Sequence, residues 1–344
     1  MKRKRRYATL YHVVNRKLHK AVERKKRVKR WLRTTSHHTR GWNNVVTSPT
    51  EVFDDKAPAD FRLLENTREC ADFFQRMRDA PQNGKNRYRI DLKDVSHIDF
   101  ASTMMLTAIG EELQNKGCRL GGNSPQRPTC ERYLIDSGFF NGKFDKNGLL
   151  FPSVRGSEFI KVERGQYKLT REHYMAFRNL IKHINLHLLG AGTKKRIYNT
   201  IIKEICANSV EWSEADKSQW TLGAKFEGDK VIIVALDLGK GILEKLYLDH
   251  WTHIKNLVSL KTGADILYGA FEQKYGSTAL EANRNRGLPC VKAAFDDGHI
   301  KDLKVVTNNS RIDFDSSEKK QFSLQRTAFK GTLYSWIIDA ECLQ

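Results

Sequence analysis

The sequence predicts a mixed α/β (α+β) fold, because strand-like and helix-like patterns alternate along most of its length. Residues 61–150 alternate short apolar runs with helically spaced ones, which is typical of βαβ units. Residues 165–344 begin with two long helical patterns and end in a series of strand-like runs. A length of 344 residues with 40% hydrophobic residues is enough for two packed domains.

The first 42 residues form a strongly basic segment that carries +15 of the formal net charge of +20. Apolar residues recur among the bases at helical spacing, so an amphipathic basic arm is expected. Such an arm either binds nucleic-acid phosphates or is a solvated helix that docks on protein, and both readings stay open. The candidate nucleic-acid-binding residues are Lys2, Arg3, Lys4, Arg5, Arg6, Arg24, Lys25, Lys26, Arg27, Lys29 and Arg30.

Residues 43–60 are rich in Asn, Thr, Ser, Pro and Asp and are expected to be a linker. A small α/β domain follows over residues 61–150. Its expected elements are a helix over 61–77, a strand over 87–92, a helix over 102–116, a strand over 118–120 and a helix over 127–137.

Polar residues with Pro152, Gly156 and Gly165 over 151–168 predict the junction to a second domain, residues 165–344. Its expected helices cover 169–189, 194–212 and 288–296, and a polar helical stretch covers 243–285. Its expected strands cover 220–226 and 231–236, which form a hairpin, and then 302–307, 311–314, 322–325 and 333–339.

Residues with the potential for nucleotide chemistry lie in this second domain. Glu204 and Asn208 are four positions apart on a predicted helix and therefore share a face. A carboxylate there can accept a proton from water, and an amide oxygen can bind Mg²⁺, which needs few protein ligands when phosphates and waters complete its shell. The plain alternative is an ordinary pair on a helix surface.

A second group of residues surrounds glycines. Asp237 ends a buried apolar run and precedes Gly239 and Gly241, so a carboxylate at a strand end would face backbone that a flat ring can approach. Gly287 precedes a predicted helix, whose free N–H groups favour phosphate. Thr332 opens the last strand, where its hydroxyl can assist Asp237 through a water molecule. Each of these motifs alone is also typical of a simple turn.

Taken in order, these motifs resemble those of the GHKL ATPases, the fold shared by DNA gyrase, Hsp90, histidine kinases and MutL. Glu204 and Asn208 match the N box, Asp237 to Ile242 match the G1 box, Arg286-Gly287-Leu288 matches a shortened G2 box, and Gly331-Thr332 matches the closing Gly-Thr. The resemblance covers residues 165–344 and implies a Bergerat-type α/β sandwich that binds Mg²⁺ and ATP under a lid, here about residues 243–285. It implies Glu204 as the catalytic base and Asn208 as the Mg²⁺ ligand. The implied nucleotide-binding residues are Asn208, Asp237, Gly239, Gly241, Ile242, Arg286, Gly287, Leu288 and Thr332.

Residues 87–140 resemble a STAS domain, the anti-sigma-factor-antagonist fold. The resemblance rests on residues 95–106, where an Ile-Asp strand end enters a helix, and on the Gly-Gly-Asn-Ser-Pro and Ser-Gly-Phe-Phe stretches. Ser102 lies near the position where such domains carry a phosphoacceptor. The favoured alternative is that Ser102 is a helix N-cap.

These features predict a regulatory protein that binds ATP and acts as a slow ATPase, with lid closure controlling a protein effector or a nucleic acid. Similar architectures also suggest antiviral defence. The alternatives are a serine or histidine protein kinase and an ATP-gated nucleic-acid clamp, and a homodimer is compatible with each. The absence of a long apolar run predicts a cytoplasmic protein without a membrane partner, and six scattered cysteines predict reduced thiols.

Overall fold

The computed structural model describes residues 52–80, 87–141, 143, 151, 160–166, 169–190, 196–211, 219–248, 261–273, 287–324 and 329–344. The predicted basic arm and its eleven candidate nucleic-acid-binding residues lie outside this set. Residues from Thr50 to Gln344 form one compact unit, so the two predicted domains pack together. Within the described part, none of the helices is long and apolar enough to cross a bilayer.

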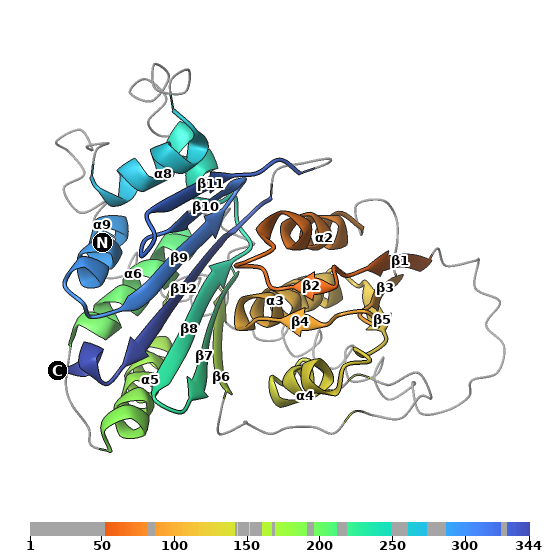
Figure 1. Cartoon of the computed structure of the whole chain (residues 1–344), viewed down its shortest axis with the longest axis horizontal. Helices are drawn as coiled ribbons and strands as arrows, with labels where there is room; N and C mark the ends of the chain where they lie inside the picture. Colours follow the sequence, from red (N-terminus) through yellow and green to blue (C-terminus); the bar gives the residue numbers. More distant parts are fainter. Residues whose placement is uncertain are drawn as a thin grey trace, which may run out of the picture. The chain divides into compact units, whose positions relative to one another are not determined.

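The N-terminal half contains two small parallel sheets, one with strand order β1-β3-β5 and one that pairs β2 with β4 (Figure 1). The strands are β1 (Val52–Lys56), β2 (Asp60–Phe61), β3 (Arg87–Asp91), β4 (His97–Ile98) and β5 (Arg119–Gly122). The helices are α2 (Thr67–Asp79), α3 (Phe100–Asn115) and α4 (Pro128–Asp136).

The C-terminal half is built on an antiparallel sheet of seven strands in the order β11-β10-β9-β12-β8-β7-β6 (Figure 1). The strands are β6 (Ile160–Gln166), β7 (Gln219–Glu227), β8 (Lys230–Asp237), β9 (Lys301–Thr307), β10 (Ser310–Asp313), β11 (Glu318–Gln321) and β12 (Thr332–Asp339). The helices are α5 (Arg171–Leu189), α6 (Arg196–Glu211), α8 (Gly263–Phe271) and α9 (Gly287–Asp296), and the 3-10 turn η3 (Glu341–Leu343) ends the chain.

The central strands of this sheet are buried on both faces. Along β8, Ile233 and Ala235 join the core under α5, α6, α8 and α9, whereas Val234 and Leu236 join the core that contains α2 and α3. Successive side chains of a strand point to opposite faces, so an uninterrupted apolar run such as this one suits a strand covered on both sides. The sheet is therefore the middle of three layers.

Several predicted elements differ from the structure at the edges of the sheets. The predicted linker over 43–60 contains β1 and the first residue of β2, because β1 pairs with β3 and completes the small sheet. Phe61 belongs to β2, so the helix predicted over 61–77 begins only at Thr67. The strand predicted over 322–325 is wrong, since the last edge strand is the polar segment β11.

The predicted junction over 151–168 contains the edge strand β6, and Gly165 explains why it reads as a loop. Gly165 lies opposite Trp220 of β7, and a Cβ at this glycine would lie 2.3 Å from the indole ring. Trp220 is 2% exposed and packs against Phe177 of α5. Because Gly165 has no side chain, the indole of Trp220 can pack directly on the backbone of β6.

We predict that Gly165→Ala lowers the free energy of unfolding by about 1–3 kcal/mol, because the new methyl group overlaps a buried indole that cannot move away. Gly121→Ala is the matched control, since Gly121 is also a strand glycine and a Cβ there meets nothing within 4 Å. Urea unfolding of both variants measures the difference. Equal stability of the two variants would contradict the packing of Trp220 over β6.

Candidate functional site

Helix α6 brings two of the predicted site residues against the start of α9. Gly287 is the first residue of α9, and a Cβ at this position would lie 2.7 Å from Nδ2 of Asn208. This Nδ2 is buried and has no hydrogen-bond partner among the described residues. Asn208 therefore directs an unsatisfied polar group at a helix N-terminus, where the free N–H groups favour an anion.

Glu204 lies one turn earlier on α6 and also faces α9. Burial raises the pKa of the Cys290 thiol in α9, and the charge of Glu204 raises it further. Glu204 itself is only partly buried, so its carboxylate has access to water. The predicted N-box pair therefore lies along the junction of α6 and α9.

Asp237 ends β8 as a buried carboxylate, 8% exposed. Its Oδ1 accepts a hydrogen bond of 2.8 Å from the N–H of Gly239. Burial raises the pKa of Cys206 in α6 and of Tyr334 in β12, and the nearby charge of Asp237 raises both further. Helix α6 therefore packs against β8, which ends at Asp237, and places Asn208 against Gly287 at the start of α9.

Tyr334 adds a second unsatisfied group beside Asp237. Its hydroxyl is buried and finds no hydrogen-bond partner among the residues that the structure describes. Most buried polar atoms in folded proteins are hydrogen-bonded, so exceptions call for a physical explanation. Two such atoms, from Asn208 and Tyr334, lie next to the residues predicted to bind a nucleotide.

Thr307 holds the strand ends around Asp237 together. Asp237 and Thr307 are each the register partner of Thr332, so the three residues are neighbours across β8, β12 and β9. The hydroxyl of Thr307 accepts from the N–H of Ile242 at 2.9 Å, donates to the carbonyl of Gly331 at 3.0 Å and lies 3.2 Å from the Thr332 hydroxyl. Sequence reasoning missed Thr307, because its role depends on strand pairing.

Asn308 fixes the glycine loop that follows Asp237. Its Nδ2 donates to the carbonyl of Lys240 at 2.8 Å, and its Oδ1 accepts from the N–H of Leu243 at 3.1 Å. Gly241 has a φ of +86°, and a Cβ there would lie 2.4 Å from Oδ1 of Asn308. A glycine at 241 is thus required by conformation and by the closeness of Asn308. The only sequence signal for Asn308 is its place in the Asn-Asn-Ser turn after β9.

The structure places the predicted nucleotide-site residues in two groups. Asp237, Gly239, Gly241, Ile242 and Thr332 lie at one end of β8 and β12, and Glu204, Asn208, Gly287 and Leu288 lie where α6 meets α9. Arg286 lies outside the described residues. Of the predicted lid, 243–248 and 261–273 are described, and α8 packs its apolar residues Ile266 and Leu267 into the helix-side core.

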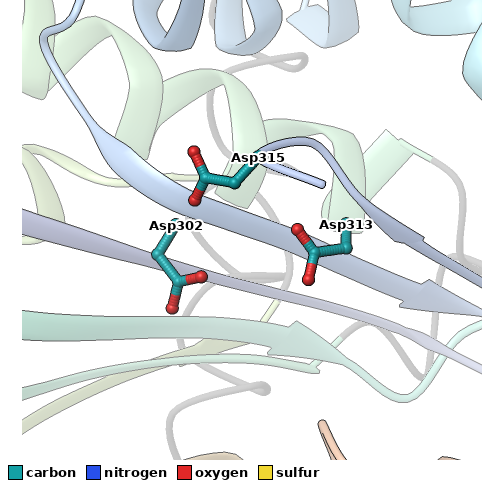
Figure 2. Close-up of side chains that lie close together, drawn as sticks. All are labelled: Asp302, Asp313 and Asp315. Atoms are coloured by element: carbon teal, nitrogen blue, oxygen red, sulfur yellow. The ribbon is translucent and has the colours of Figure 1, made fainter. Parts of the chain in front are cut away.

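An acidic cluster lies elsewhere on the same sheet. Carboxylate oxygens of Asp302, Asp313 and Asp315 lie within 4.8 Å of one another (Figure 2). The ammonium of Lys304 forms ion pairs with Asp302 and, at 3.8 Å, with Asp313. Because a lysine already compensates these charges, we assign no metal to the cluster.

A cavity of about 560 Å³ lies beside β5 in the N-terminal half. Its walls are mostly apolar and include Leu120, Phe139, Phe140 and Phe151. The one ammonium group in the lining belongs to Lys143. It donates to the carbonyl of Phe139 and lies 4.4 Å from the centre of the Phe139 ring. None of the lining residues belongs to the nucleotide motifs.

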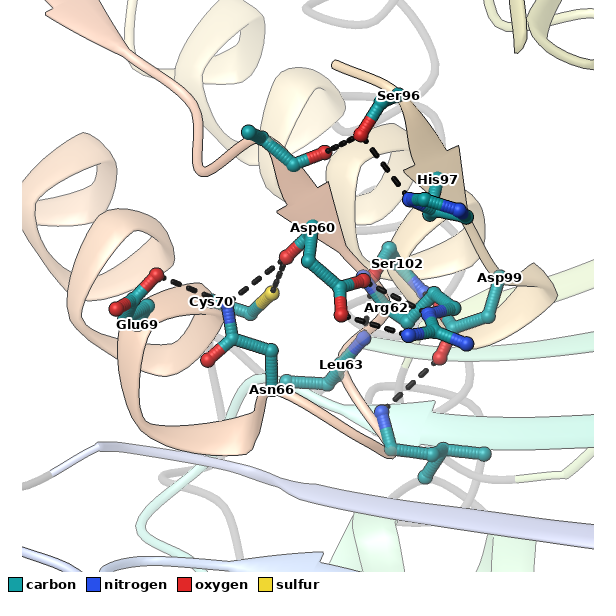
Figure 3. A network of polar contacts seen from close by, with 12 residues as sticks. Asp60, Arg62, Leu63, Asn66, Glu69, Cys70, Ser96, His97, Asp99 and Ser102 are labelled. Atoms are coloured by element: carbon teal, nitrogen blue, oxygen red, sulfur yellow. Dashed lines mark hydrogen bonds and ion pairs between the residues drawn. The ribbon is translucent and has the colours of Figure 1, made fainter.

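Ser102 does not have the position expected of a phosphoacceptor or of an N-cap. Asp99 is the N-cap of α3, and its Oδ1 accepts from the N–H of Ser102 at 2.6 Å (Figure 3). Ser102 is 0% exposed, and its hydroxyl accepts from the N–H of Leu63 at 2.9 Å. Phosphorylation of Ser102 would require this buried network to open.

Comparisons with known proteins give no family for the chain. No family model matches it, and no curated protein matches it. Among solved structures, the mycobacterial sensor histidine kinase MprB matches with 14% sequence identity and a TM-score of 0.23, over 43% of this chain and 74% of that chain. This likeness is too distant to carry a conclusion about activity.

We predict that Gly241→Ala lowers the free energy of unfolding by roughly 2–4 kcal/mol, because it adds left-handed strain to a clash with Asn308. Gly298→Ala is the control, since Gly298 has a similar φ of +73° and a Cβ there meets nothing within 4 Å. It should lose only about 1–2 kcal/mol from conformational strain. Guanidinium unfolding of both variants measures the difference, and an equal loss in the two would remove the role assigned to Asn308.

Proposed function

We propose that the C-terminal half is a nucleotide-binding domain of the GHKL type that binds Mg²⁺ and ATP where α6, β8 and α9 meet. The observation that carries this proposal is the position of α6, which packs against both β8 and α9 and places Asn208 directly against Gly287. An acceptor for adenine at the end of β8 and a helix N-terminus for phosphates are then both neighbours of α6.

Asp237 is suited to read adenine. A buried carboxylate accepts the exocyclic amino proton of adenine, whereas guanine presents a carbonyl oxygen at the same place. The N–H of Gly239 donates to Oδ1 of Asp237 at 2.8 Å, and this hydrogen bond fixes the orientation of the carboxylate. Thr332, the register partner of Asp237, offers its hydroxyl to the same edge of the base, directly or through water. The site therefore favours ATP over GTP.

The start of α9 is suited to the phosphates. The N–H groups of its first turn attract negative charge. Asn208 lies against Gly287 with both amide atoms, and its buried Nδ2, which has no partner among the described residues, is a donor suited to a phosphate oxygen. The amide oxygen would bind Mg²⁺, which would neutralise charge on the phosphates.

Glu204 is the proposed base for ATP hydrolysis, since it lies one turn from Asn208 on the same face of α6. A single general base with few supporting groups fits slow turnover, as in a switch that controls a protein or nucleic-acid partner. Phosphate transfer to a histidine of α5 is the alternative. Nδ1 is hydrogen-bonded in both His173 and His183, to the N–H of Thr170 at 3.0 Å and to the carbonyl of Asn179 at 2.8 Å, and His183 is the more exposed of the two.

The first test is ATP binding by the full chain and by Asp237→Asn, measured by titration calorimetry with Mg²⁺. We expect the variant to bind ATP about 100-fold more weakly, because a hydrogen bond to a charged acceptor is lost. Asp229→Asn, in the exposed turn of the same hairpin, should bind as the unchanged protein does. Unchanged affinity of Asp237→Asn would refute the adenine assignment.

The second test is turnover by Glu204→Ala. We expect unchanged ATP affinity and a kcat that falls by about 10²–10⁴-fold, because the group that accepts the proton from water is removed. Release of labelled phosphate from γ-labelled ATP measures this. Retained turnover would show that Glu204 is not the base, and label that stays on the protein would favour the kinase alternative.

A further inference from the structure

One arginine of the N-terminal half contacts both loops that border the proposed nucleotide site. Arg78 lies in the last turn of α2 and is 8% exposed. Its Nη1 donates to the carbonyl of Lys330 at 2.6 Å, and its Nη2 donates to the carbonyl of Leu238 at 2.7 Å. A planar guanidinium with five N–H donors can bridge two carbonyls in this way, whereas an ammonium offers no such fixed fork.

Both carbonyls lie next to residues of the site. Leu238 lies between Asp237 and Gly239, and Lys330 precedes Gly331 and Thr332. Gly331 approaches so closely that a Cβ would lie 2.5 Å from the carbonyl oxygen of Asp237. The guanidinium of Arg78 therefore bridges the two loops that continue from the strand ends carrying Asp237 and Thr332.

Neighbouring residues hold Arg78 in this position. Its Nε donates to Oε2 of Glu112 in α3 at 2.9 Å. Burial raises the pKa of Glu112, but the charge of Arg78 and hydrogen bonds from Arg78 and Lys116 outweigh it, so the carboxylate stays ionised. Gln75, one turn before Arg78, accepts the N–H of Lys330 at 3.2 Å. Helix α2 is thus tied to both loops, and α3 is tied to them through Arg78.

We propose that Arg78 is a positioning residue for the nucleotide site and couples nucleotide binding to helices α2 and α3. This inference rests on the proposed function. When ATP contacts Asp237 and Thr332, it stabilises the strand-end spacing that Arg78 also stabilises. By thermodynamic reciprocity, nucleotide binding then strengthens the attachment of α2, and a partner that shifts α2 or α3 changes the affinity for ATP.

The test compares Arg78→Ala with Arg76→Ala in the full chain, by calorimetric titration with ATP and Mg²⁺. Arg76 is the matched control, because it is also an ion-paired arginine of α2 and its ion pairs are with Asp55 and Asp72, away from the site. Both substitutions remove a salt bridge and should lower the Tm. Only Arg78→Ala should weaken ATP binding, by roughly tenfold.

Two further measurements separate positioning from a general loss of structure. Gln75→Ala removes one neutral hydrogen bond to Lys330 and should weaken ATP binding by about threefold. Hydrogen exchange in peptides covering 67–79 should slow when ATP is added to the unchanged protein and to Arg76→Ala, but not to Arg78→Ala. Arg78→Lys should not restore the affinity, because lysine cannot bridge both carbonyls.

The outcomes are distinguishable. If the unchanged protein fails to bind ATP, the proposed function itself is wrong. If it binds ATP and Arg78→Ala binds equally well, the positioning role is overturned. An equal loss of affinity in Arg76→Ala and Arg78→Ala would also overturn it, because the effect would then follow stability. Should Arg78→Ala fail to fold, the affinity and exchange of Gln75→Ala decide the question.

Discussion

The burial of β8 and β12 on both faces is the constraint on which the rest of the structure depends. Alternate residues of β8 enter different cores, Ile233 and Ala235 under the helices and Val234 and Leu236 against α2 and α3. A shift of register by one residue would exchange the two sets of side chains. Packing from both sides therefore fixes where each strand ends, and the site residues Asp237 and Thr332 occupy those ends.

Polar interactions at this end of the sheet follow from the same constraint. Buried N–H and carbonyl groups need partners, and the side chains of Thr307 and Asn308 satisfy those of the glycine loop. Against this well-satisfied background, the amide of Asn208 and the hydroxyl of Tyr334 are exceptions among the described residues. Asn208 adjoins Gly287, and Tyr334 lies near Asp237, whereas other such atoms, among them Oγ1 of Thr67 in α2, lie elsewhere.

The sequence predicts the central elements well, because their patterns reflect local burial. The hairpin of β7 and β8, the helix α6 and the strand β12 all follow from apolar spacing, and they carry Glu204, Asn208, Asp237 and Thr332. The edge strands were missed for physical reasons. Strand β6 contains a glycine that accommodates a distant tryptophan, and β11 is charged, as exposed edges often are.

The contacts that tie the two halves together were beyond local patterns. Arg78 reads as an ordinary basic residue near a helix end, and nothing in the sequence near it indicates Leu238 or Lys330. Thr307 and Asn308 likewise act on residues more than sixty positions away. Such interactions depend on which strands pair and which helices cover them.

The double-sided sheet also means that the motif-bearing half is not an autonomous folding unit. A fragment starting near residue 165 would lack β6 and would leave an apolar surface that includes Val234, Leu236, Val306 and Leu333 open to water. Exposed surfaces of this kind favour aggregation or self-association. The smallest fragment suitable for study therefore begins before β1.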